Sequence, residues 1–374
     1  MFKRLSFILL ALIVSLSVLM AACAPAPAPT EAPAAPTEVP PTAANAPALP
    51  SPEPPTVAPP TPTPPPPAVC DKLPSAPAAP AAGQLGAADN PIVITFVPSG
   101  DTGKITKAGT AIADCLAGMT GLAFKMEVGT SFAASIEAMG AEKAQVSFLN
   151  TLSALLAASK YEVFPAMLAI RKYSTNDVDP DKALAGEPEP FYRGQFIANV
   201  ASGVTSFADL KGKSFCWVDP NSTSGYVMPR IVLKANGIDP DVDFSSVQNA
   251  GSHDNVAIAV YNGDCDAGVS YVNVLTDTVA NLVGTYPDIM DKVKPFAVTD
   301  RIPNDGMQFI KTLDPAIQTA IVDGILFMTK DPGGKAVLKG LYNYDSMVKV
   351  EPNTYDEFLA VLVKAGIDPA ELVK

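Results

Sequence analysis

The chain has 374 residues and a formal net charge of −12 at pH 7, from 26 Lys and Arg against 38 Asp and Glu. Nucleic-acid partners require clustered positive charge, and the sequence has no basic run, so a nucleic-acid-binding protein is excluded. A single histidine and the lack of a CxxC spacing argue against a metal site. Between Pro25 and Pro80 lie 22 of the 38 prolines, and the sequence after Asn90 is ordinary globular sequence, long enough for two lobes.

Residues 1–22 predict a secretory signal peptide, because Lys3 and Arg4 precede an apolar run and small residues follow. Residues 19–23 (Leu-Met-Ala-Ala-Cys) resemble the bacterial lipobox, with Met20 where that pattern prefers leucine. The resemblance implies cleavage before Cys23 and a lipid on that cysteine; the alternative is an ordinary signal peptide. Residues 23–88, rich in Pro, Ala and Thr, predict a disordered tether. We therefore expect an exported protein, lipid-anchored at the outer face of the cell membrane or periplasmic.

Four more cysteines fit an oxidising compartment. Three pairings are possible. We predict Cys216 with Cys265, because a 2-1-3 strand order would make their strands neighbours, and Cys70 with Cys115, which would clip the end of the tether to the first helix. Four free thiols are the alternative.

Strands and helices alternate along the globular part, which predicts an α/β fold. Residues 92–97 form a continuous apolar run, typical of a strand buried on both faces in a parallel sheet. Further strands are expected at 123–128, 144–149, 191–200, 214–218, 245–248, 267–271 and 293–298. Helices are expected at 104–119, 131–140, 151–159, 204–213, 224–235, 253–261, 315–328, 333–341 and 354–365.

Two strand-to-helix junctions carry polar residues that suit an anion. Residues 219–225 (Asp-Pro-Asn-Ser-Thr-Ser-Gly) place the hydroxyls of Ser222, Thr223 and Ser224 beside the free N–H groups of a helix start. Simple helix capping is the alternative. Pro229 would free the carbonyl of Gly225, so we expect an irregular helix start.

The second junction is residues 251–254 (Gly-Ser-His-Asp), at the same expected edge of the sheet. A helix start disfavours a cationic imidazole, so His253 should be neutral near pH 7 and gain a fractional proton when an oxyanion binds. A packed histidine is the alternative.

Two other chemistries are disfavoured. Residues 100–104 (Gly-Asp-Thr-Gly-Lys) lack the glycine spacing of a nucleotide phosphate loop. Ser-His-Asp catalysis through His253 lacks a Gly-x-Ser-x-Gly elbow, and Asp254 adjoins the histidine in sequence.

The segments 192–195, 210–215, 219–226, 250–254, 262–268 and 302–305 together resemble the phosphate/phosphite/phosphonate substrate-binding proteins of ABC importers. The resemblance covers about residues 91–329. It implies a type II periplasmic-binding fold: α/β, with two doubly wound lobes and a ligand cleft between them. We expect lobe 1 at 89–196 and 297–374 and lobe 2 at 197–296. The resemblance also implies that Ser222, Thr223, Ser224 and His253 hold the oxyanion.

Ser99, Phe132, Tyr192 and Asp305 complete the candidate ligand-binding set. Phe132 replaces a tyrosine that is frequent in the family, and Ala154 replaces an aromatic residue. Members that take aminoalkylphosphonates use acidic residues against the ammonium. Asn273 stands near that place, with Asp305 the remaining acidic candidate, so a small or non-amine ligand is favoured.

The sequence thus predicts a lipoprotein that captures a small phosphorus oxyanion (phosphonate, phosphite or phosphate) and delivers it to an ABC transporter permease. No catalysis, cofactor or metal is expected. The alternatives are a binding protein for a sulfonate or other organic ligand and a secreted hydrolase.

Overall fold

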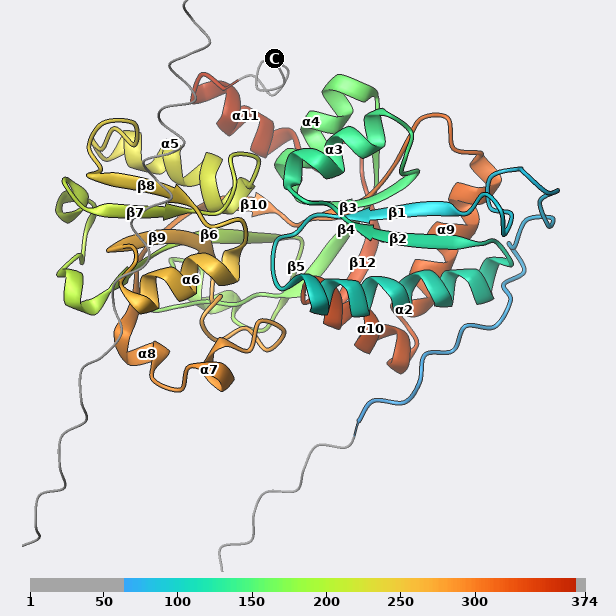
Figure 1. Cartoon of the computed structure of the whole chain (residues 1–374), viewed down its shortest axis with the longest axis horizontal. Coiled ribbons are helices and arrows are strands. Elements are labelled where there is room, and N and C mark those ends of the chain that lie inside the picture. The colour runs from blue at the N-terminus through green and yellow to red at the C-terminus, as the bar shows by residue number, and fades with distance from the viewer. Residues whose placement is uncertain (1–63, 368–374) are drawn as a thin grey trace, which may run out of the picture. The chain divides into compact units, whose positions relative to one another are not determined.

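The computed structural model describes residues 64–367, which form two α/β lobes, each built on one sheet (Figure 1). The predicted signal peptide, Cys23 and the first part of the predicted tether lie outside these residues. Within 64–367, no helix has the length and apolar character needed to cross a membrane.

The first sheet has seven strands in the order β12-β4-β11-β3-β1-β2, with β5 paired to β4. β1, whose residues are almost all buried, pairs in parallel with β2 and β3, as expected for residues 92–97, whereas β11 and β12 run antiparallel to their neighbours. β4, β11 and β12 were not predicted from the sequence. The strands are β1 (Ile92–Phe96), β2 (Phe124–Val128), β3 (Val146–Leu149), β4 (Phe164–Lys172), β5 (Pro188–Glu189), β11 (Gly306–Phe309) and β12 (Ser346–Lys349).

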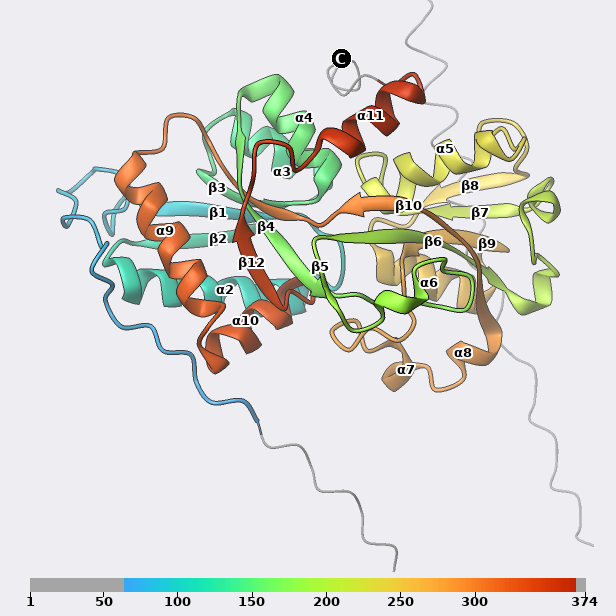
Figure 2. The ribbon, with the colours of Figure 1, turned by 180° about the vertical axis from the view of Figure 1, so that it is seen from behind.

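Helices cover both faces of this sheet, α2, α9 and α10 on one side and α3 and α4 on the other (Figures 1 and 2). Asp101 caps the first of them by accepting a hydrogen bond from the Lys104 N–H (2.8 Å), and Gly121 ends it in the left-handed region (φ 74°). The helices are α2 (Thr102–Thr120), α3 (Phe132–Gly140), α4 (Thr151–Tyr161), α9 (Pro315–Met328) and α10 (Pro332–Tyr342).

The second sheet has five strands in the order β10-β6-β9-β7-β8, with α5 and α6 on opposite faces (Figure 1). β7 lies between β8 and β9, so the predicted 2-1-3 order of these strands is confirmed. The elements are β6 (Phe191–Asn199), β7 (Ser214–Trp217), β8 (Ser246–Asn249), β9 (Ala267–Tyr271), β10 (Val293–Pro303), α5 (Met228–Ala235), α6 (His253–Asn262), α7 (Leu282–Thr285) and α8 (Ile289–Lys292).

The sheets divide the chain at different residues from the expected lobe boundaries at 196/197 and 296/297. β6 and β10 pair along their lengths, from Val293 opposite Asn199 to Pro303 opposite Phe191, so both strands belong to the second sheet. The connections between the sheets therefore lie near residues 190 and 304. The last helix, α11 (Asp356–Lys364), contacts β10 and so also touches the second lobe.

Residues 64–88 lie against the first lobe, so the predicted end of the tether at residue 88 is wrong. The Val69 N–H donates to Asp331 at the start of α10 (3.1 Å), and the Leu73 N–H donates to the Met119 carbonyl (2.8 Å). Leu73 and Leu85 also pack against the hydrophobic core. These apolar residues give the segment side chains that it can bury against the lobe. The high proline content had indicated a disordered segment instead.

Both disulfides have the expected partners. Cys70 is bonded to Cys115 in α2, and Cys216 in β7 is bonded to Cys265 just before β9, with Cα–Cα distances of 4.9 and 5.8 Å. Each closes a loop of more than 40 residues, for which chain entropy gives about 4 kcal/mol of stabilisation.

Candidate functional site

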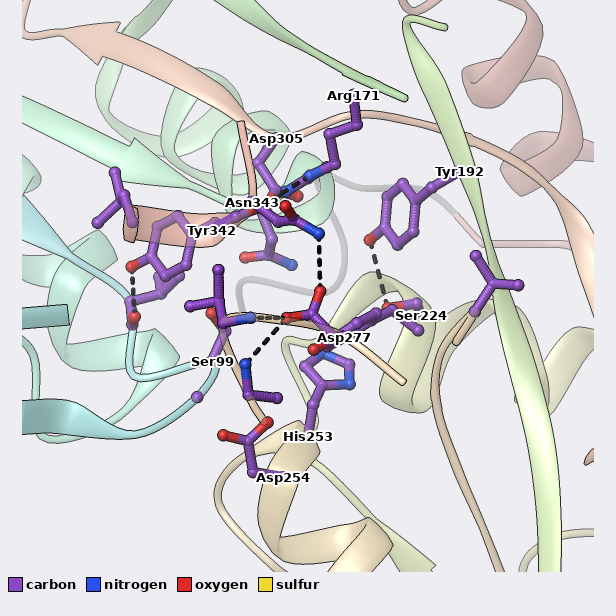
Figure 3. Close-up of a pocket in the computed structure, with 18 of the residues that line it drawn as sticks. Ser99, Arg171, Tyr192, Ser224, His253, Asp254, Asp277, Asp305, Tyr342 and Asn343 are labelled. Carbon is purple, nitrogen blue, oxygen red and sulfur yellow. Dashed lines mark hydrogen bonds and ion pairs between the residues drawn. The ribbon is translucent and has the colours of Figure 1, made fainter. Parts of the chain in front are cut away.

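A cavity of about 110 Å³ lies where the two lobes meet (Figure 3). This is well above the roughly 10–15 Å³ that a cavity needs to hold a single water, so there is room for a small ligand. Of the predicted ligand-binding residues, seven line it: Ser99, Phe132, Tyr192, Ser222, Ser224, His253 and Asp305.

The first helix start has the irregular geometry expected from Pro229. A π-helical turn, η4 (Thr223–Val227), precedes α5, and Ser222 caps it by accepting from the Gly225 N–H (3.1 Å). Because Pro229 has no N–H to donate, the Gly225 carbonyl instead accepts from the Val218 N–H (3.1 Å). The turn leaves the Ser222 and Ser224 side chains at the cavity wall.

Thr223 is not a cavity residue, which corrects the prediction. Its hydroxyl oxygen accepts from the Asn150 side-chain amide and from the Leu152 N–H of α4, both at 2.9 Å. The π turn rotates this side chain towards the first lobe, so Thr223 joins the lobes, while its neighbours on either side face the ligand space.

His253 begins α6 at the cavity, and its backbone N–H donates to the Ser99 carbonyl of the other lobe (2.9 Å). Its Nδ1 lies 3.0 Å from the Ser270 hydroxyl and its Nε2 3.5 Å from the Ser222 hydroxyl. Burial, together with the nearby charge of Arg171, lowers the pKa of His253 to about 3. The imidazole is therefore neutral, as predicted, but at so low a pKa the predicted proton uptake by His253 near pH 7 is not expected.

Arg171, at the end of β4, lines the cavity and was not among the predicted ligand-binding residues. Its guanidinium donates to Asp305 (2.7 Å), to the Asn304 side chain (2.6 Å) and to the Tyr342 carbonyl (3.0 Å). Burial opposes its charge, but Asp305 and nearby phenols more than offset this, so the pKa of Arg171 is raised and the group stays charged. Asp305 is therefore the partner of Arg171, and less available to a ligand than expected.

Aromatic side chains shape the rest of the wall. The Tyr192 hydroxyl lies 3.3 Å from the Ser224 hydroxyl, and its ring lies beneath the Arg171 guanidinium. Phe132 is buried at the start of α3, where the tyrosine frequent in the family would add a hydroxyl.

Carboxylates occupy another part of the wall (Figure 3). Asp277 accepts from the backbone N–H groups of Val279 and Ala280 and from Asn343 (2.9 Å). Asp254 is nearly buried, and this burial raises its pKa to about 6 even though Lys104 lies nearby. The cavity therefore offers hydroxyl donors and a guanidinium on one part of its wall and acidic acceptors on another.

Direct hydrogen bonds join the lobes around the cavity. The Lys104 ammonium of α2 donates to the carbonyls of Val279 and Ala280, both at 2.7 Å, in the loop that also carries Asp277. Asn343 of the first lobe reaches Asp277 of the second. These contacts enclose the space between the helix starts.

A family model of the periplasmic phosphonate substrate-binding proteins of ABC transporters matches residues 94–355. The chain belongs to this family. It is 23% identical to the phosphate-import protein PhnD of Mycolicibacterium smegmatis over 237 residues, 59% of this chain and 70% of that protein. It is 29% identical to the phosphonates-binding periplasmic protein of Escherichia coli over 164 residues, 43% of this chain and about half (47%) of that protein.

Two solved structures share the fold. A binding protein component of an ABC phosphonate transporter from Pseudomonas aeruginosa aligns with a TM-score of 0.62 at 20% identity, over 74% of this chain and 86% of that one. PhnD1 from Prochlorococcus marinus, solved in complex with methylphosphonate, aligns with a TM-score of 0.60 at 17% identity, over 74% and 98%. The predicted periplasmic-binding architecture is confirmed.

The chain is therefore an extracytoplasmic substrate-binding component of an ABC transporter, and the prediction of a binding protein rather than an enzyme is confirmed. Among residues 64–367, no three or more His, Cys, Asp or Glu side chains are grouped to hold a metal ion.

Proposed function

We propose that the chain captures a small phosphorus oxyanion in the interlobe cavity and delivers it to its permease. The observation that carries the proposal is the convergence of the η4 helix start, the Tyr192 hydroxyl and the Arg171 guanidinium on one small cavity. Hydroxyls, backbone N–H groups and a fixed positive charge are the groups that bind oxyanions. Asp219, two residues after the end of β7, leads the chain into this helix start.

The acidic net charge of the chain does not oppose this function. Side-chain charges more than about 10 Å away are screened by salt, whereas the dipoles of the helix start act in direct contact with the ligand. Inside the cavity, Asp305 offsets Arg171, and Asp254 and Asp277 add acceptors. An oxyanion that still carries a proton can donate it to these acceptors.

A cavity wall with both hydrogen-bond donors and carboxylate acceptors favours phosphorus oxyanions over sulfate. Phosphate, phosphite and alkylphosphonates can carry a proton near neutral pH, whereas sulfate is fully ionised and can only accept hydrogen bonds. A sulfate beside the largely buried Asp254 carboxylate has no proton to donate to it, whereas a protonated phosphorus oxyanion can form this hydrogen bond, which contributes about 1.5–3 kcal/mol when one partner is charged.

Trp217 should report binding, because it ends β7 and its ring contacts Tyr226 of η4 (5.1 Å between centroids). We expect phosphate, phosphite or methylphosphonate to change its fluorescence, and sulfate at the same concentration to leave it unchanged. Calorimetry would measure the affinity for each of these ligands. A response to sulfate or to an alkylsulfonate alone would instead favour a sulfonate receptor.

We also propose that Cys23 carries a lipid that anchors the protein outside the cell membrane, on the strength of the lipobox-like residues 19–23 and the Pro-rich segment behind them. Replacing Cys23→Ser should move the protein from the detergent phase to the aqueous phase of a Triton X-114 partition. Equal partitioning of the variant and the wild type would contradict the anchor.

A further inference from the structure

The segment between β4 and β5, residues 174–186, leaves the first sheet and returns to it; we name it the β4–β5 loop. Its neck is closed by two hydrogen bonds, from the Tyr173 N–H to the Glu187 carbonyl (2.7 Å) and from the Gly186 N–H to the Tyr173 carbonyl (2.9 Å). Both ends of the loop therefore belong to the first lobe.

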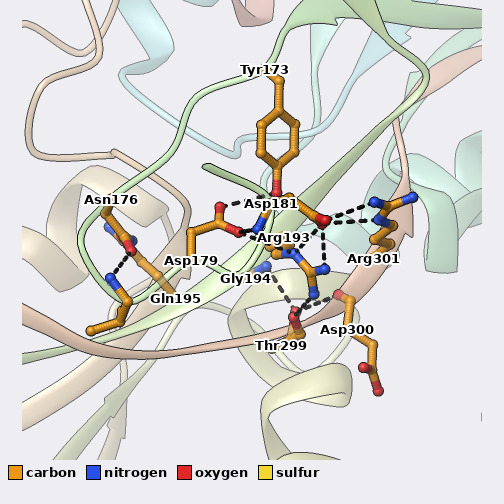
Figure 4. A network of polar contacts seen from close by, with 11 residues as sticks. Tyr173, Asn176, Asp179, Asp181, Arg193, Gly194, Gln195, Thr299, Asp300 and Arg301 are labelled. Atoms are coloured by element: carbon orange, nitrogen blue, oxygen red, sulfur yellow. Dashed lines mark hydrogen bonds and ion pairs between the residues drawn. The ribbon is translucent and has the colours of Figure 1, made fainter. Parts of the chain in front are cut away.

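Side-chain contacts attach the body of this loop to the other lobe (Figure 4). Asn176 donates to Gln195 of β6 (2.8 Å), and Asn273, just after β9, donates to the Thr175 carbonyl. The loop thus crosses from the first sheet to the second in addition to the two strand connections near residues 190 and 304.

Two aspartates of the loop meet two arginines of the crossing strands. Asp181 accepts from Arg301 of β10 at 2.7 and 2.9 Å and from the Arg193 Nε of β6 at 3.1 Å. Asp179, whose side chain is fully buried, lies 3.5 Å from Arg193 and accepts from the Tyr173 hydroxyl (3.0 Å). The two arginines face each other in the β6–β10 register, so a single carboxylate, that of Asp181, holds both strands.

The neck of the β4–β5 loop lies at the ligand cavity. Lys172, Tyr173 and Ser174 line the cavity, and the Tyr173 ring packs on that of Phe191 (5.4 Å between centroids). Hydrogen bonds from Arg301 and Arg193 hold the pKa of Asp181 well below its ordinary value, so the cluster stays charged. A displacement of the loop would therefore move one wall of the cavity.

We propose that Asp181 is a positioning residue: by pinning the β4–β5 loop to the second lobe through Arg193 and Arg301, it fixes the cavity wall at Tyr173 and Ser174 and limits the size of the substituent on the bound oxyanion. The size-limiting part rests on the function proposed above, whereas the pinning of the loop does not.

Hydrogen–deuterium exchange of the ligand-free full chain tests the pinning. In Asp181→Asn, peptides covering 174–186 should exchange about tenfold faster or more, the loss expected for a hydrogen bond to a charged group. Arg301→Met is a milder second variant, because the Arg301 side chain is half exposed and its loss leaves the contact between Asp181 and Arg193 intact. Asp300→Asn is the matched control, since it removes the same charge from the neighbouring exposed residue of β10.

Calorimetry with methylphosphonate and phenylphosphonate tests the effect on size. The wild type should prefer methylphosphonate, and Asp181→Asn should lower that preference about tenfold while Asp300→Asn keeps it. Equal weakening of both ligands would show a general structural role and overturn the proposal, as would unchanged exchange of the loop. A wild type that binds no phosphorus ligand would contradict the proposed function, while the exchange experiment would still decide the pinning.

Discussion

Replacing Arg171→Met should lower the free energy of unfolding by about 2–4 kcal/mol, because Asp305 then remains largely buried without its charged partner. The side chains of both residues are only 17–18% exposed, so water compensates little of this loss. The variant also leaves the Tyr342 carbonyl and the Asn304 side chain without a donor. Urea denaturation followed by circular dichroism would measure the change.

The same variant should weaken methylphosphonate binding about tenfold or more, because the cavity loses the fixed positive charge closest to Tyr192. The double variant Arg171→Met/Asp305→Asn separates the effect on stability from the effect on binding. It removes both charges, so it should regain most of the lost stability but none of the affinity. A double variant no more stable than the single one would contradict the ion-pair account, and one with wild-type affinity would remove Arg171 from the ligand's environment.

Arg171 also shows why part of the site was not predicted from the sequence. β4 contains Pro165 and few β-branched residues, and β11 is a four-residue strand that begins at a glycine, so neither has the composition typical of a strand. In the fold, a Cβ at Gly306 would lie 2.1 Å from the Met167 carbonyl oxygen, which explains a glycine in a central strand. Without β4, nothing in the sequence placed Arg171 beside Asp305.

The two helix starts were predictable because their signals are local. Small hydroxyl residues after an apolar strand determine capping, and Pro229 alone determines the irregular turn. Which hydroxyl faces the ligand was not predictable, since it depends on the rotation of the π turn. That rotation directs Thr223 to Asn150, a contact between residues far apart in sequence.

The acidic wall, and not His253, should take up the proton when ligand binds. The pKa of Asp254 is about 6 in the free protein, and Lys104, Asp101 and Asp277 are the charged groups around it. A bound oxyanion disfavours the ionised carboxylate and raises this pKa further. Binding should therefore take up a fraction of a proton between pH 6 and 8, and affinity should increase as the pH falls through this range once the ligand's own ionisation is subtracted.

Calorimetry in two buffers of different ionisation enthalpy measures this uptake. Asp254→Asn should abolish it, whereas His253→Gln should retain it, because the His253 pKa of about 3 lies too far below this pH range for a bound oxyanion to raise it into the range. The reverse result would restore His253 as the titrating group, and equal uptake in both variants would exclude both.

The Asp254 carboxylate should also make the free energy of unfolding depend on pH. Its pKa rises from about 3.9 in the unfolded chain to about 6 in the folded protein, so between these values the folded state binds more protons. The free energy of unfolding should therefore fall as the pH rises from 4 to 7, by about 2 kcal/mol for this group. Asp254→Asn should remove this part of the pH dependence and be more stable than the wild type at pH 7. Wild-type and variant stability profiles that stayed parallel from pH 4 to 7 would show that folding does not raise the pKa of Asp254, and would exclude Asp254 as the group that takes up a proton when ligand binds.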